Sequence, residues 1–210
     1  MGRWRAVAVV TALVLYALAS HALMVHAPAE PWTVGALFGP LLVVLTVGGW
    51  KRRHAPTLVA CAGLTALLAA ICARGGIDVN RLYVLQHAAI HLVLGATFAF
   101  SLRPGSKPLI TAMAERVHEQ FPPPMRAYTR RLTALWAVYF GAMIVVSLLI
   151  YALAPWSWWS FYCNLVTPLS AALFFVGEHV VRYRRHPDFE RVSLAGAARA
   201  WRAQRAAGTP

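Results

Sequence analysis

The chain has 210 residues, of which 59% are hydrophobic and only 13% charged. A soluble domain normally carries about 25% charged residues, so this composition excludes an ordinary soluble enzyme and indicates a membrane protein. The formal net charge of +13 would suggest nucleic-acid binding in a soluble protein. In a membrane protein, however, the charges must first be placed relative to the bilayer.

Six apolar stretches are long enough to cross a bilayer, which requires about 20 mostly apolar residues in a helix. The segments between them are polar or contain proline and glycine, as expected where helices end. We therefore predict an all-α, polytopic membrane protein with one transmembrane domain over residues 1–182. Its six transmembrane helices are expected at residues 6–26, 33–50, 57–73, 82–101, 132–154 and 159–181.

The first span has a second interpretation, as a cleaved secretory signal peptide. Arg3 and Arg5 precede the apolar run, and Ala19-Ser20-His21-Ala22 has the small residues of a cleavage site. The apolar run continues through Val25 and reaches spanning length. We therefore favour a helix that stays in the protein, and cleavage remains the alternative.

Lysine and arginine are distributed unevenly among the connecting segments. Eighteen of the twenty lie at the N-terminus, in residues 51–53, in the loop 102–131 or after residue 181, and only Arg74 and Arg81 belong to the opposite side. The positive-inside rule places the cation-rich side in the cytoplasm. We predict an N-in/C-in topology in a multi-pass protein of the bacterial inner membrane.

Aromatic residues and cysteines add further expectations. Three cysteines within apolar runs, Cys61, Cys72 and Cys163, exclude a disulfide-stapled scaffold and a four-cysteine zinc site, although a Cys72–Cys163 bridge stays open. Tryptophans near the ends of predicted spans are expected in the headgroup layer. They are Trp4, Trp32, Trp50, Trp156, Trp158 and Trp159.

The fourth span contains the most informative polar residues at membrane depth. His87 and His91 lie one turn apart on one helix face, next to Gln86. This spacing suits a metal, a proton relay or a hydrogen-bonded polar ligand, so these three residues are the catalytic candidates. If the first, fourth and sixth spans meet, His21 and Asn164 would join them. The alternative is that all these groups link neighbouring helices by hydrogen bonds.

Metal binding is a weak prediction for this histidine group. His21, His87 and His91 are the candidate ligands. No aspartate, glutamate or cysteine shares the face of the fourth span that carries His87 and His91. The sequence also lacks hydrolase, zinc-peptidase and nucleotide-binding motifs. No cofactor is therefore expected, and no enzyme class is predicted.

Glu178 is the only acidic residue within a predicted span. Arg182 follows one turn later, so a paired carboxylate is the simplest expectation, and Glu178, Arg182 and Asn164 are predicted to be structural. The alternative makes Glu178 a partner of the basic cytoplasmic loop.

The loop 102–131 contains a Pro-Gly turn between Arg103 and Lys107. Turn amides with these cations, and with Arg130 and Arg131 before the next span, would form a site for an anion such as phosphate. Residues 111–119 predict a short interfacial helix that ends at Phe121-Pro-Pro-Pro124, and Pro155-Trp156-Ser157 predicts a tight turn before the last span.

The C-terminal residues 183–210 form a basic, partly amphipathic tail that is expected to lie on the inner leaflet. Attraction to anionic lipids explains this charge as well as that of the loop 102–131. We therefore expect membrane lipids, and no nucleic acid, as partners.

Motifs in residues 80–187 resemble those of one family of uncharacterised bacterial inner-membrane proteins. They are Tyr83-Val-Leu-Gln86-His87 with His91, Phe100-Ser-Leu-Arg103-Pro-Gly105 with Pro108-Leu-Ile-Thr111, Tyr128-Thr-Arg130 with Thr133 and Trp136, and Trp159-Ser-Phe161 with Asn164, Pro168, Glu178 and Arg182. The family is found alongside enzymes that make aryl-polyene and xanthomonadin-type pigment lipids. This resemblance implies a role in that pathway.

Three functions follow as hypotheses. The favoured one is an accessory subunit that handles lipid-linked or carrier-linked acyl intermediates in pigment-lipid biosynthesis or export. An acidic acyl carrier protein or a pathway enzyme would then be a candidate partner for the basic face. The second is a membrane enzyme for acyl or headgroup transfer that uses Gln86, His87 and His91, and the third is a haem or metal redox protein.

Overall fold

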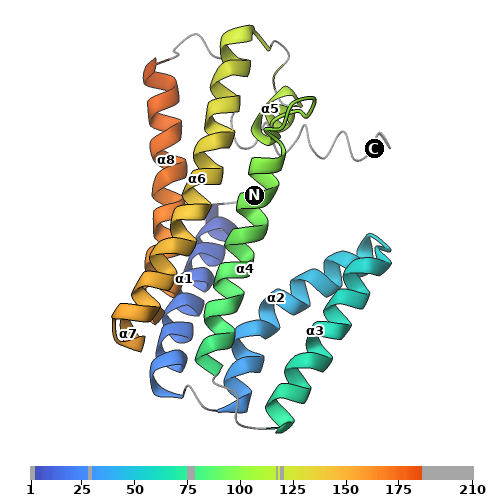
Figure 1. Ribbon diagram of the computed structural model, residues 1–210, viewed down its shortest axis with the longest axis vertical. Coiled ribbons are helices and arrows are strands. Elements are labelled where there is room, and N and C mark those ends of the chain that lie inside the picture. The colour runs from blue at the N-terminus through green and yellow to red at the C-terminus, as the bar shows by residue number, and fades with distance from the viewer. Residues whose placement is uncertain (1–2, 28–29, 75–78, 117, 119–120, 186–210) are drawn as a thin grey trace. The chain divides into compact units, whose positions relative to one another are not determined.

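The computed structural model describes residues 3–27, 30–74, 79–116, 118 and 121–185, and every regular element among them is helical (Figure 1). The elements are α1 (Arg3–His26), α2 (Pro31–Lys51), α3 (Ala55–Arg74), α4 (Val79–Phe100), α5 (Leu109–Glu115), α6 (Pro123–Leu153), α7 (Trp156–Phe161), the π-helical segment η1 (Tyr162–Val166) and α8 (Thr167–Arg185). Six helical stretches are long and apolar enough to cross a membrane, the last being α7, η1 and α8 together. The predicted six-span, all-α architecture is confirmed.

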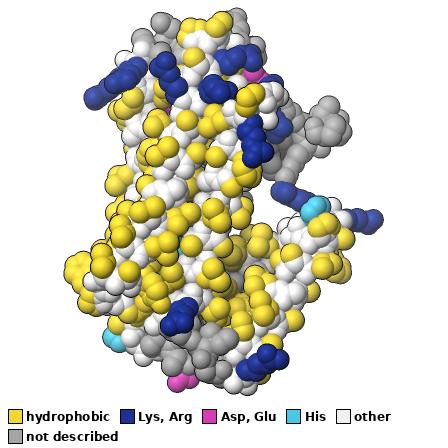
Figure 2. Space-filling view, in the orientation of Figure 1, with side chains coloured by type: hydrophobic (Ala, Val, Ile, Leu, Met, Phe, Trp, Pro, Cys, Tyr) yellow, Lys and Arg dark blue, Asp and Glu magenta, His cyan; other side chains and the backbone are white. Residues whose placement is uncertain are grey.

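The outer surface of these helices is largely hydrophobic. Val44, Leu92, Val138 and Leu173 are each more than 60% exposed, and hydrophobic side chains cover most of the face shown in Figure 2. Several of the fully buried side chains, by contrast, are small and polar, namely Ser20, Thr33, Thr111, Thr133, Ser147 and Ser160. Helices in lipid gain little from hiding apolar surface and are joined by close packing and polar contacts, which explains this distribution.

Two predicted boundaries are wrong, and proline explains both. Helix α6 begins at Pro123, well inside the predicted loop 102–131, because prolines are tolerated in the first turn of a helix, where the N–H has no partner. The predicted turn at Pro155-Trp156-Ser157 is confined to Ala154 and Pro155. Pro155 caps α7 instead, and Trp156 and Ser157 are already helical.

The described chain forms two compact units. Among the described residues, the first consists of those within 3–86 and 149–168, and the second of those within 87–148 and 169–185. The predicted basic tail lies outside the described residues, except for its first residues, which end α8.

Aromatic rings organise the core of the first unit. Trp159 is fully buried and stacks on Trp156 with ring centroids 4.7 Å apart, while Phe38 stacks on Tyr83 at 5.6 Å. Trp159 thus packs inside the protein, contrary to the prediction that it faces lipid headgroups. The three cysteines are free thiols, so the Cys72–Cys163 bridge does not form.

In the second unit, α4 and α6 approach closely at Gly95. A Cβ atom added to this glycine would lie 3.3 Å from the Cβ atom of Phe140, tighter than an ordinary contact. Hydrogen bonds then hold α5 against α6: the Thr111 and Thr129 hydroxyls lie 2.8 Å apart, and the Ile110 amide donates to Thr133 Oγ1. The N-terminal half of α6 is therefore packed against both α4 and α5.

Candidate functional site

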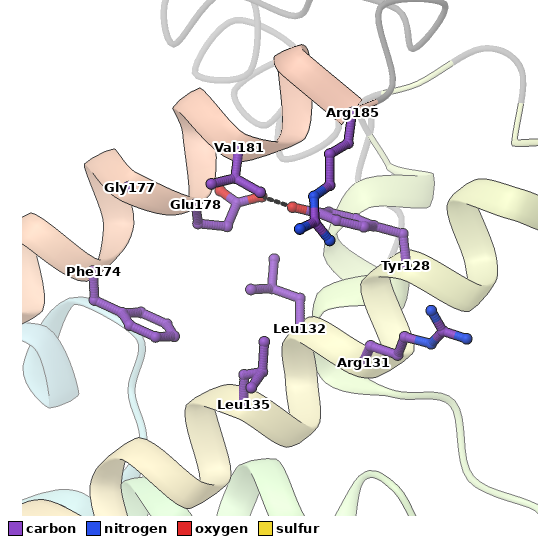
Figure 3. A pocket seen from close by; sticks show the side chains of 9 residues that line it. All are labelled: Tyr128, Arg131, Leu132, Leu135, Phe174, Gly177, Glu178, Val181 and Arg185. Carbon is purple, nitrogen blue, oxygen red and sulfur yellow. Dashed lines mark hydrogen bonds between the residues drawn. The ribbon is translucent and has the colours of Figure 1, made fainter.

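Helices α6 and α8 border a groove of about 430 Å³ within the second unit (Figure 3). This volume falls in the range of about 300–1,000 Å³ that is usual for ligand pockets. The lining residues come from one face of each helix: Tyr128, Arg131, Leu132 and Leu135 from α6, and Phe174, Gly177, Glu178, Val181 and Arg185 from α8. Their spacings of three and four residues are those of neighbours on a helix surface.

The wall of the groove is mainly apolar. Leu132 and Leu135 point from α6 into the space between the helices, and Phe174 points into it from α8 (Figure 3). Gly177 carries no side chain, so it leaves this part of the space open. Such a wall suits a hydrocarbon chain rather than a polar substrate.

A hydrogen-bonded carboxylate lies between Phe174 and Arg185 along α8 (Figure 3). The Tyr128 hydroxyl donates to Glu178 Oε1 at 2.9 Å, and Arg182 Nε lies 3.4 Å from the same oxygen. The i+4 spacing predicts the arginine partner. Tyr128 is a second partner that the sequence does not reveal, because it belongs to a different helix and no local spacing connects the two positions.

Two further arginines line the groove, and the guanidinium of Arg131 points away from the space between the helices (Figure 3). Arg131 and Arg185 line it, and neither forms a salt bridge with a carboxylate among the described residues. Counted with Arg182, the groove and its border hold three cations and the single carboxylate of Glu178, a formal balance of +2. Guanidinium groups bind carboxylates and phosphates through paired hydrogen bonds, so an anionic group fits here.

Aromatic packing closes the groove at its apolar end. The Phe174 ring lies edge-on to Trp136, with centroids 4.6 Å apart, and stacks on Tyr139 at 5.2 Å. Beyond it, the hydroxyls of Tyr139 and Ser170 are hydrogen-bonded at 2.8 Å and join α6 to α8. The groove therefore has Arg185 at one end and, at the other, a phenylalanine ring packed against two aromatic rings.

The four residues of the predicted anion site in the loop do not share one site, because each makes a different contact. Arg103 lies over the Phe100 ring at 4.1 Å, and Arg130 donates to the carbonyl of Leu102 at 3.2 Å. Lys107 is bonded to Glu115 at 2.5 Å. Of the four predicted residues, only Arg131 lines the groove.

Glu115 neutralises much of the remaining charge near the loop. The hydrogen bond from Lys107 lowers the pKa of the Glu115 carboxyl below its usual range, and the charges of Lys107 and Arg126 add to this effect. Arg126 lies 3.2 Å from Glu115 Oε1. Lys107 and Arg126 thus hold α5 in place through Glu115.

The predicted histidine pair is present in the second unit. His87 and His91 are both buried, and their ring centroids lie 4.2 Å apart. His91 Nδ1 lies 2.8 Å from the carbonyl oxygen of His87. A carbonyl only accepts, so this nitrogen is the donor. The described residues contain no group of three or more His, Cys, Asp or Glu side chains that could hold a metal ion.

His21 and Asn164 both contact Ser160 in the first unit. His21 Nδ1 lies 2.8 Å from the buried Ser160 hydroxyl, and the Asn164 amide donates to the Ser160 carbonyl at 2.9 Å. Asn164 also lies 3.2 Å from Met24 Sδ. These contacts join α1 to α7 and η1, as hydrogen bonds between neighbouring helices do. Gln86, the third catalytic candidate, is half-buried and belongs to the first unit as well.

Three comparisons of this chain with known proteins gave no match. No protein-family model matches it, and neither a curated protein nor a solved structure is significantly similar to it. The function is accordingly argued from the groove between α6 and α8.

Proposed function

We propose that the protein is a membrane subunit that holds the acyl chain of an anionic amphiphile in the groove between α6 and α8. One observation carries the proposal: the groove combines an apolar wall, formed by Leu132, Leu135 and Phe174, with Arg185 at the end opposite Phe174 (Figure 3). Arg131 adds a second cation at its border. A hydrocarbon tail fits the wall, and a phosphate or carboxylate fits the arginines. No catalytic step is needed for this role.

The environment from which the acyl tail comes, lipid or a water-soluble carrier, decides which contacts provide the affinity of the groove for the ligand. A tail that is already in lipid gains little hydrophobic free energy from the groove, because lipid is as apolar as leucine. The arginines and the shape of the groove must then select the ligand. A tail delivered from a water-soluble carrier gains about 0.8 kcal/mol for each buried methylene. Both sources present the same chemistry, an anionic head on an acyl tail.

The first prediction is that a bulky residue in the wall blocks binding. Replacing Leu135 with tryptophan should lower the affinity for an anionic amphiphile at least about tenfold, equivalent to about 1.4 kcal/mol, because the indole occupies the space of the tail. The measurement is photocrosslinking of a diazirine-bearing alkyl phosphate to the protein in lipid nanodiscs, with mass spectrometry of the labelled peptides.

The matched control for this experiment is Val138→Trp. Val138 lies on the same helix, is 69% exposed and does not line the groove. It should leave the labelling of α6 and α8 unchanged. Equal labelling of the Leu135→Trp variant and the unaltered protein would contradict the proposal.

The resemblance to the pigment-lipid family supports a cellular setting for this role. We place the protein in the bacterial inner membrane, as an accessory subunit for acyl intermediates of aryl-polyene or xanthomonadin-type lipids. The exposed arginines of the second unit, among them Arg103 and Arg130, would attract an acidic acyl carrier protein.

Deletion of the gene tests this setting. Mass spectrometry of the membrane lipids should show accumulation of an acyl intermediate and loss of the finished pigment lipid. Complementation with the unaltered gene should restore the profile, whereas the Leu135→Trp variant should not. A lipid profile unchanged by the deletion would contradict the assignment to this pathway.

A further inference from the structure

We infer that Phe174 sets the length of the tail that the groove accepts. The inference rests on the proposed function, since it assigns a selectivity to the same groove. The ligands concerned are amphiphiles with a phosphate head and one tail in the groove. The aromatic end of the groove limits the length of that tail.

The position of Phe174 provides the first argument. Arg185 and Phe174 lie at opposite ends of the groove on α8, separated by eleven residues. At about 1.5 Å per residue, this separation is roughly 16 Å along the helix axis. A head bound to Arg185 therefore directs its tail along Val181 and Gly177 toward the Phe174 ring (Figure 3).

The surroundings of Phe174 provide the second argument. Its ring is held by Trp136 on one side and Tyr139 on another, and Tyr139 is in turn hydrogen-bonded to Ser170. A long tail cannot displace the ring without breaking these contacts, because packed side chains do not move freely into occupied space. The tail must end at Phe174 or leave the groove.

A length limit has a measurable signature. While an added methylene still enters the groove, it strengthens binding from water by up to about fourfold, which corresponds to about 0.8 kcal/mol. Once the tail reaches Phe174, further methylenes add no contact with the groove. A plot of affinity against tail length should therefore show a break.

The experiment is competition by octyl, decyl, dodecyl, tetradecyl and hexadecyl phosphate against the photoreactive probe, with the protein held in amphipol so that each compound binds from water. Phe174→Ala should move the break to longer tails and bind the longest compound about tenfold more tightly than the unaltered protein does. Phe174→Trp, which projects further into the groove, should move the break to shorter tails.

Phe175→Ala is the matched control, because Phe175 is the next residue on α8, is 50% exposed and does not line the groove. It should leave the break in place. A break at the same tail length in the unaltered protein, Phe174→Ala and Phe174→Trp would overturn the inference and leave the proposed function standing. Failure of every alkyl phosphate to compete would overturn both.

Discussion

Replacement of Trp159 with alanine is expected to lower the free energy of unfolding by about 3–5 kcal/mol, the usual cost of deleting a large buried aromatic side chain. Trp159 has no exposed surface and belongs to the core cluster that contains Met24, Phe38 and Tyr83. Its stacking on Trp156 would also be lost. The surrounding helices can close such a space only in part, so a cavity remains.

The measurement is reversible unfolding by sodium dodecyl sulfate in mixed micelles, followed by circular dichroism. Trp158→Ala is the control, because Trp158 is the preceding residue of α7 and is 62% exposed. The control should change the free energy of unfolding by about 0.5 kcal/mol or less. Equal losses in the two variants would show that Trp159 does not have the core role that its burial indicates.

Reversal of both groove arginines, Arg131→Glu with Arg185→Glu, is expected to weaken binding of an alkyl phosphate on the order of a hundredfold or more. Hydrogen bonds to charged groups contribute about 1.5–3 kcal/mol each, so the loss of two amounts to about 3 kcal/mol at least. The change also turns a balance of +2 at the groove and its border into −2, counting Arg131, Arg182, Arg185 and Glu178 before and after the substitutions.

The control must change the net charge of the protein by the same amount. Arg103→Glu with Arg116→Glu does so at two exposed positions of the second unit that do not line the groove. Competition against the photoreactive probe at low and high salt compares the two pairs. A similar loss in both would mean that the overall positive charge, rather than the groove, attracts the ligand, since such attraction is screened by salt. Binding of an alkyl maltoside, whose head carries no charge, should not change with either pair of substitutions.

The sequence alone determined the class of fold. A helix must supply all its backbone hydrogen bonds within lipid, so the length and apolar character of each run are sufficient to predict a span. The same local reasoning predicted that Glu178 pairs with Arg182, because residues four apart are neighbours on a helix. It failed at Pro123 and Pro155, since a proline can either end a helix or occupy its first turn.

Only the tertiary structure decided where the polar residues act. Tyr128 and Glu178 are 50 residues apart, and His21 and Ser160 are 139 residues apart, yet each pair is hydrogen-bonded. The sequence likewise placed Arg103, Lys107, Arg130 and Arg131 in one basic loop, whereas folding directs Lys107 to Glu115 and Arg131 to the groove. The physical reason is that hydropathy depends on the residues of one segment, whereas a binding site depends on which faces of different helices pack together.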